Sequence, residues 1–129
     1  MRKGRSPASP PARPRGAARF ETKLRVWVVF GDDDVKFGDG RADLLERIER
    51  LGSFNKAVAE FGMSYRGAWG YFRELERAAG MQFLERRPGG GPAGGTRLTA
   101  EARRFLDQYR RFRRGLDREV ARHFKQSFR

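Results

Sequence analysis

Two arginines, Arg66 and Arg73, are the side chains in this sequence whose type and position best suit binding chemistry. They lie on a helical segment away from its apolar stripe, and Arg66 falls in the first turn of that segment. A guanidinium that makes two hydrogen bonds to a guanine edge discriminates between bases by about 1–3 kcal/mol. The expected chemistry is therefore recognition of bases in a DNA groove, with Ser64, Tyr65 and Gly70 beside the two arginines.

Catalytic and metal-binding chemistry has few candidate residues. The sequence has no Cys and a single His, His123, which removes disulfides, Cys/His zinc sites and thiol chemistry. Residues 32–34 are all Asp but lack the ligand spacing of a calcium loop. Gly89, Gly91 and Gly94 match the dinucleotide pattern GxGxxG, but a strand follows them where that fold needs a helix. We expect no enzyme activity, no metal and no cofactor.

The two arginines belong to the second of two short helices predicted within residues 53–80. Ser53 and Ser64 stand at N-cap positions, and Gly62 ends the first helix. The apolar positions of both helices recur at the spacing of one buried face, and they are Phe54, Ala57, Val58, Phe61, Ala68, Phe72, Leu75 and Ala79. Two helices joined by a Gly-containing turn form a helix-turn-helix, whose second helix lies in the major groove of DNA.

The flanking segments predict a wing, a hairpin and a further helix. Strands at 81–87 and 96–99 surround a glycine-rich tip, and Arg86, Arg87 and Arg97 beside that tip suit contacts with a phosphate backbone. Residues 24–30 predict a strand that turns back into 35–37, with Trp27 in the core. Residues 39–52 predict a helix beneath the helix-turn-helix, and Trp69 is expected mainly in the core.

A long helix is predicted from residue 100 to the end of the chain, with Thr99 as its cap. Its apolar stripe is longer than a small domain can cover, which favours pairing with a second copy of the chain. The residues expected at that contact are Phe105, Tyr109, Phe112 and Leu116. The alternatives are a helix folded back over its own domain, a second nucleic-acid surface and an amphipathic membrane helix.

Charge is distributed unevenly along the chain. The sequence holds 29 Lys and Arg against 16 Asp and Glu, a net charge of +13, which favours a polyanionic partner. Residues 64–99 contain six positive and three negative charges, so a basic excess falls on the second helix and the wing. Residues 1–22 are expected to form a disordered basic arm, either a solubilising tail or a segment that follows phosphates. No apolar run approaches the roughly 18 residues of a spanning helix, and we expect a cytoplasmic protein without membrane contact.

Two stretches resemble a known family. GSFNKAVAEFGMSYRGAWGYFRELE at 52–76 and FLERRPGGGPAGGTRLTAEA at 83–102 are similar to the N-terminal DNA-binding domain of the molybdate-responsive, ModE-type transcriptional regulators, which is related to that of LysR-type regulators. The resemblance covers roughly residues 24–120. Its most specific pieces are GMSYRGAW at 62–69, the Gly-Ser pair at 52–53, the glycine-rich wing and the Leu-Thr pair at 98–99. It implies a winged helix-turn-helix, a homodimer and a palindromic operator in duplex DNA. Molybdate binding is not expected, because the chain ends at Arg129 without the oxyanion-binding domain of that family.

The sequence thus predicts a mainly α fold with short β-hairpins, namely a winged helix-turn-helix over 23–99 followed by a dimerisation helix over 100–129. The expected function is sequence-specific regulation of transcription, with sequence-insensitive nucleoid or RNA binding as the alternative. The residues expected to contact DNA are Ser53, Lys56, Ser64, Tyr65, Arg66, Gly70, Arg73, Arg86, Arg87 and Arg97.

Overall fold

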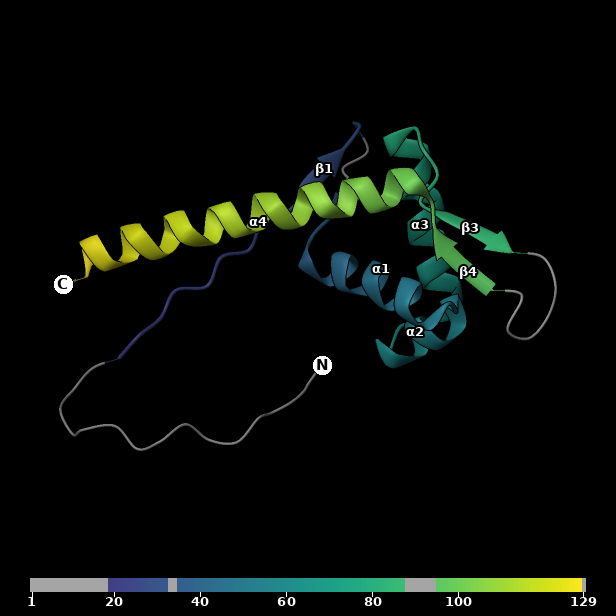
Figure 1. Ribbon diagram of the computed structural model, residues 1–129, viewed down its shortest axis with the longest axis horizontal. Helices are drawn as coiled ribbons and strands as arrows, with labels where there is room; N and C mark the ends of the chain where they lie inside the picture. Colours follow the sequence, from purple (N-terminus) through teal and green to yellow (C-terminus); the bar gives the residue numbers. More distant parts are fainter. Residues whose placement is uncertain (1–18, 33–34, 88–94, 129) are drawn as a thin grey trace.

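The computed structural model describes residues 19–32, 35–87 and 95–128, and these form a mainly helical fold with two small hairpins (Figure 1). The elements in chain order are β1 (Val28–Phe30), β2 (Val35–Phe37), α1 (Asp39–Leu51), α2 (Phe54–Glu60), α3 (Tyr65–Ala79), β3 (Leu84–Arg87), β4 (Gly95–Leu98) and α4 (Ala100–Ser127). Strands β1 and β2 pair antiparallel, as do β3 and β4, and the two hairpins are separate sheets. The predicted fold class, a winged helix-turn-helix with a long C-terminal helix, is confirmed.

The helices begin where the capping residues predicted. The backbone N–H of Lys56 donates to Ser53 Oγ (3.1 Å), and that of Gly67 donates to Ser64 Oγ (2.9 Å). Thr99 caps α4 in the same way. A side-chain cap of this kind stabilises a helix by about 1 kcal/mol, because it satisfies an amide that has no partner within the helix. The start of α3, which carries Arg66, is therefore fixed locally.

The turn between α2 and α3 is short and uses a left-handed residue. Gly62 has φ of 69°, a conformation that costs a residue with a side chain appreciable strain. The N–H of Met63 returns to the carbonyl of Val58 (3.1 Å). This bond closes the end of α2 and sets the angle at which α3 leaves the turn.

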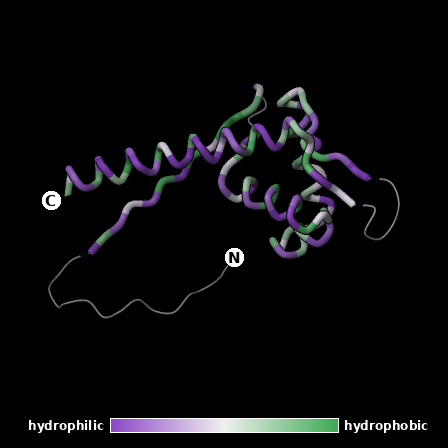
Figure 2. The backbone as a smooth tube through the Cα atoms, viewed as in Figure 1, coloured by the Kyte–Doolittle hydropathy of each residue, from purple (hydrophilic) through white to green (hydrophobic). Residues whose placement is uncertain are grey.

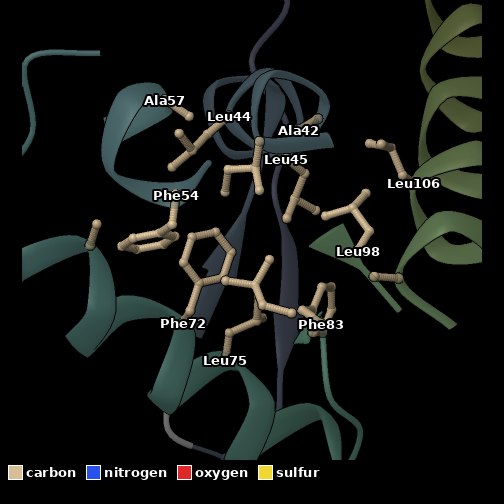
Figure 3. Packing of buried hydrophobic residues seen from close by; sticks show 14 of the residues in the cluster. Ala42, Leu44, Leu45, Phe54, Ala57, Phe72, Leu75, Phe83, Leu98 and Leu106 are labelled. Atoms are coloured by element: carbon tan, nitrogen blue, oxygen red, sulfur yellow. The ribbon is translucent and has the colours of Figure 1, made fainter. Parts of the chain in front are cut away.

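The core lies between all four helices and the bases of both hairpins (Figure 3). Phe72 and Leu75 project inward from α3 and are fully buried, and Phe54 of α2 packs beside them. The other large side chains that are fully buried are Phe37, Leu44, Leu45, Ile48, Phe83 and Leu98. Burial of each of these side chains contributes about 1.5–3 kcal/mol, so the inner face of α3 is held firmly and its outer face is presented to solvent.

The wing is attached to α3 and to α1 by one carboxylate each. Glu76 Oε2, on α3, accepts hydrogen bonds from the backbone N–H groups of Phe83 (2.8 Å) and Leu84 (3.2 Å). Glu49 Oε1, on α1, accepts one from the N–H of Leu98 (2.9 Å). Both strands of the wing therefore keep a fixed position relative to α3. The glycines of the GxGxxG pattern, at 89, 91 and 94, lie outside the described residues.

Helix α4 packs on the domain with its first half and extends beyond it with its second (Figure 1). Tyr109 is buried, and its ring lies edge-on to Phe37, with the ring centroids 5.2 Å apart. Phe105 packs against the same ring at 4.9 Å. Tyr109 was expected at a contact between copies, and that expectation is corrected, because its own chain already buries its side chain. Phe105 is only partly buried, and its place at such a contact stays a prediction. Phe112 is 47% exposed, and Leu116 is partly exposed.

The N-terminal segment differs from its prediction. The strand begins at Val28, and Trp27 is 52% exposed instead of buried. In extended backbone successive side chains point to opposite sides, and here Val26 and Val28 take the side toward the domain. Before the strand the chain runs along α4, where Arg113 Nη2 donates to the carbonyl of Leu24 (2.6 Å). Most of the predicted basic arm, residues 1–18, lies outside the described part of the chain.

Candidate nucleic-acid interface

The outer face of α3 carries Arg66, Gly70, Arg73 and Arg77, which recur every three or four residues and so form one stripe along the helix. All four are exposed. This stripe lies opposite the buried residues of the same helix, and the arrangement is the one that a recognition helix needs. The sequence-predicted residues Arg66, Gly70 and Arg73 are thus brought together.

The two predicted base-reading arginines have free guanidinium groups. Among the described residues, neither Arg66 nor Arg73 makes an ion pair or a hydrogen bond through its side chain. Arg77, further along the stripe, pairs with Glu74 of the same helix. An arginine without a protein carboxylate keeps all five N–H donors for an external acceptor, such as a phosphate or a guanine edge.

An aromatic and cationic cluster joins the start of α3 to the wing. The guanidinium of Arg86 lies 5.0 Å from the centre of the Trp69 ring, and its Nη2 donates to the Tyr65 hydroxyl (3.3 Å). Trp69 in turn packs on Phe54 at 4.8 Å between ring centroids. Hydrogen bonds from the side chains of Trp69 and then Arg86 lower the pKa of Tyr65 below its usual value of 10. No short-range pattern indicated this contact, since Arg86 is far from Tyr65 and Trp69 along the chain.

A small hollow of about 230 Å³ lies where the starts of α2 and α3 meet the wing. Four predicted contact residues line it, namely Ser53, Tyr65, Arg86 and Arg87. Arg97 does not join them, because it stands opposite Glu85 on β3 while Arg86 stands opposite Thr96. Adjacent positions of a strand face opposite sides, so Arg97 lies on the face of the hairpin opposite to Arg86 and Thr96.

Acidic side chains of α1 are paired with arginines of α4. Arg110 donates to Asp43 (2.7 Å) and to Glu46 (2.8 Å), and these hydrogen bonds raise the pKa of Arg110. Arg103 pairs with Glu49 at 3.1 Å. Part of the positive charge of α4 is thus neutralised by acidic side chains of α1 within the same chain.

Asp39 is the most densely bonded of these acids. Its Oδ1 accepts from the Tyr109 hydroxyl (2.6 Å) and from Arg113 Nε (3.1 Å). Burial alone raises the pKa of this carboxyl, but the hydrogen bonds from Tyr109 and Arg113 outweigh that effect and lower it. Burial, followed by the hydrogen bond to Asp39, raises the pKa of Tyr109 to about 12.

Two other classes of site are absent from the described residues. Across 19–32, 35–87 and 95–128, no group of three or more His, Cys, Asp or Glu side chains is arranged to hold a metal ion. None of the helices in these ranges is long and apolar enough to cross a membrane.

Comparison with known proteins points to one family of regulators. The chain is 38% identical to the molybdenum transport protein ModE of Azotobacter vinelandii over 96 residues, which are 73% of this chain and 34% of that protein. It is 38% identical to the transcriptional regulator ModE of Haemophilus influenzae over 69 residues, 54% of this chain and 27% of the relative. With the DNA-binding transcriptional dual regulator ModE of Escherichia coli the identity is 32%, over 54% of this chain and 26% of the relative.

No family profile matches the chain. The chain spans about a third or less of the length of these curated relatives. The relatives nevertheless agree with one another and with the resemblance of residues 52–76 and 83–102. The chain is therefore a homologue of the molybdate-responsive, ModE-type transcriptional regulators.

Proposed function

We propose that this chain is a DNA-binding transcriptional regulator that places α3 in the major groove and its wing on the phosphate backbone. The observation that carries the proposal is the pair of exposed guanidinium groups, Arg66 and Arg73, which have no partner among the described residues. They lie on the outer face of a helix whose inner face is fixed in the core. Recognition helices contact base edges with residues near their N-terminus, which is the position of Arg66.

The names of the relatives support a role as a transcriptional regulator and not as an enzyme. Two of the relatives are named transcriptional regulators, and the name of one of them states that it binds DNA. We carry both properties over to this chain as part of the proposal, together with a cytoplasmic location on the nucleoid. Ser53, Lys56, Ser64, Tyr65 and Gly70 would assist the arginines at the groove.

We further propose that the regulator acts as a homodimer through the outer half of α4. Apolar residues recur along α4 out to its C-terminal end (Figure 2). Phe112 and Leu116 are the predicted contact residues that remain accessible there. Pairing two copies about a two-fold axis doubles the number of bases that are read, since one recognition helix contacts only a few base pairs.

Selection of preferred sequences from random duplex DNA tests the function directly. A single enriched inverted repeat is the expected result, and Arg66→Ala should weaken binding to it by about 1–3 kcal/mol and relax the preference at one base position. Arg111→Ala, which removes an exposed arginine of α4, serves as the control and should keep the preference. Equal binding of all duplexes, or stronger binding of single-stranded RNA, would instead identify a sequence-insensitive nucleic-acid binder.

A further inference from the structure

A large hollow of about 1130 Å³ lies beside α3, and of the residues in the interface described so far only Gly70 lines it. Its walls are the N-terminal segment 22–27, the junction of β2 with α1, and the part of α3 that carries Gly67 and Gly70. It therefore adjoins the outer face of the proposed recognition helix.

The hollow and the wing lie on opposite sides of that outer face. Residues advance by about 100° around a helix, so Tyr65 and Trp69 fall on one side of Arg66, and Gly67, Gly70 and Glu74 fall on the other. Tyr65 and Trp69 contact Arg86 of the wing. Gly67, Gly70 and Glu74 line the hollow. The stripe with Arg66 and Arg73 runs between the two.

The hollow is basic. Lys23, Arg25, Lys36 and Arg41 contribute to its lining. Among the described residues, Lys23 and Arg25 make no ion pair, and both are exposed. Arg41 lies over the ring of Tyr71 at 4.7 Å, and its Nη1 approaches the sulfur of Met63 at 3.9 Å, so neither of these contacts neutralises its charge.

The acidic groups of the lining are held by other cations. Asp39 and Asp117 both pair with Arg113, at 3.1 Å and 2.5 Å. Glu74 pairs with Arg77. The charge that the hollow presents to an incoming ligand is therefore positive, which suits a polyanion.

The walls are fixed relative to α3. The Tyr71 hydroxyl, on α3, donates to the carbonyl of Lys36 at 2.6 Å. The ring of Trp27 lies directly on Gly38, where a Cβ atom would stand only 2.8 Å from ring Cδ1. At Gly70 a Cβ atom would meet no atom within 4 Å, so the missing side chain leaves the hollow open toward the recognition stripe.

We propose that this hollow receives the phosphate backbone of the duplex on the side of α3 opposite to the wing. The inference rests on the proposed function. A helix in the major groove has one backbone on each side of it, because the two strands border the groove, which is about 12 Å wide. The wing faces one backbone, and the hollow faces the other with Lys23, Arg25 and Arg41. These cations hold phosphates and read no bases.

The test compares two double variants that lose the same charge. Lys23→Gln/Arg25→Gln removes two cations from the hollow, and Arg111→Gln/Lys125→Gln removes two exposed cations of α4. Affinity for the selected duplex is measured over a range of salt concentrations, together with hydroxyl-radical footprints. Each lost phosphate contact lowers the slope of log affinity against log salt by about one unit, so the hollow variant should lose about two units per protomer. Its footprint should also lose protection on one flank of the bases read by α3, while the control keeps both.

The outcomes separate this inference from the function on which it rests. If the wild type binds no duplex, the proposed function fails and the inference fails with it. Suppose that the wild type binds duplex DNA and that Arg66→Ala weakens this binding. If Lys23→Gln/Arg25→Gln then keeps the wild-type salt slope and footprint, the proposed function stands and the inference is overturned. A slope lost equally in both double variants also overturns it, because the effect would then follow net charge alone.

Discussion

Arg86 of the wing and Tyr65, the first residue of α3, are joined by a hydrogen bond of 3.3 Å from guanidinium to phenol. The sequence assigned both residues to DNA contacts, but it did not indicate that they touch each other. The contact connects the wing to the start of α3, beside Arg66. Two parts of the candidate interface therefore act as one surface.

This contact predicts an unusual order of tyrosine ionisation. The pKa of Tyr65 lies below 10, because of its hydrogen bonds, whereas burial raises the pKa values of Tyr71 and Tyr109 to about 12. Near-ultraviolet absorbance of the phenolate should show one tyrosine ionising first and two ionising much later. Arg86→Gln should move the first step to higher pH and leave the other two unchanged. Three tyrosines ionising together near pH 10 would contradict the structure.

The same titration carries a prediction about stability. A tyrosine whose folded pKa is raised contributes stability that is fully present below its unfolded pKa of about 10. That contribution is lost as the pH rises from about 10 through 12, where Tyr71 and Tyr109 ionise in the folded state. The midpoint of urea unfolding should therefore fall over this window, and Tyr109→Phe should reduce the fall.

Asp39 predicts a loss of stability in acid. Its folded pKa is lowered, so its contribution is present above the unfolded pKa of about 3.9 and is lost as the pH falls through the folded value. The side chain is 49% exposed, so solvent screening keeps the effect small. Asp39→Asn should flatten the dependence of thermal stability on pH below 4, whereas Asp107→Asn, an exposed aspartate of α4, should leave it as in the wild type.

Glu76 is expected to hold the wing in place. Glu76→Ala leaves the backbone N–H groups of Phe83 and Leu84 without their carboxylate acceptor, which should cost about 1–3 kcal/mol of unfolding free energy. Glu74→Ala removes only an exposed ion pair with Arg77 and should cost less than about 1 kcal/mol. Denaturant unfolding measures both, and equal losses would show that the carboxylate of Glu76 has no special role.

Phe112 tests the proposed dimer. Phe112→Asp places a charge on the exposed outer half of α4 and should dissociate the dimer in sedimentation experiments while helical content is retained. Gln108→Asp adds the same charge at an exposed position outside the apolar stripe and should leave the dimer intact. A wild type that sediments as a monomer of 14.8 kDa and binds a single half-site as well as a palindrome would contradict the dimer.

Much of the fold followed from short-range signals in the sequence. The starts of three helices were predicted by their capping residues, Ser53, Ser64 and Thr99. This was possible because a capping oxygen and the amide that donates to it are only three residues apart. The inward positions of α3 followed from helical periodicity in the same way. These features depend on neighbours along the chain, which a sequence displays directly.

The errors concern contacts between distant segments. The exposure of Trp27 depends on which side of an extended segment faces the domain, and alternation alone leaves that choice open. The burial of Tyr109 was missed because the apolar stripe of α4 was given to a partner chain. A signal was present, since acids at 39, 43, 46 and 49 recur along one face of α1 and arginines at 103, 110 and 113 recur along one face of α4.

The pairing of α1 with α4 has a consequence for the spacing of half-sites on DNA. Arg103, Arg110 and Arg113 contact α1 at successive points along its length, so the angle between α4 and the rest of the domain is set within one chain. In the proposed dimer the paired outer halves of α4 would then fix the distance and the relative orientation of the two α3 helices. Inserting about five base pairs between the half-sites turns one of them to the opposite side of the duplex. A dimer with this fixed geometry should then lose binding to one half-site, whereas a dimer joined by a flexible linker would tolerate the change.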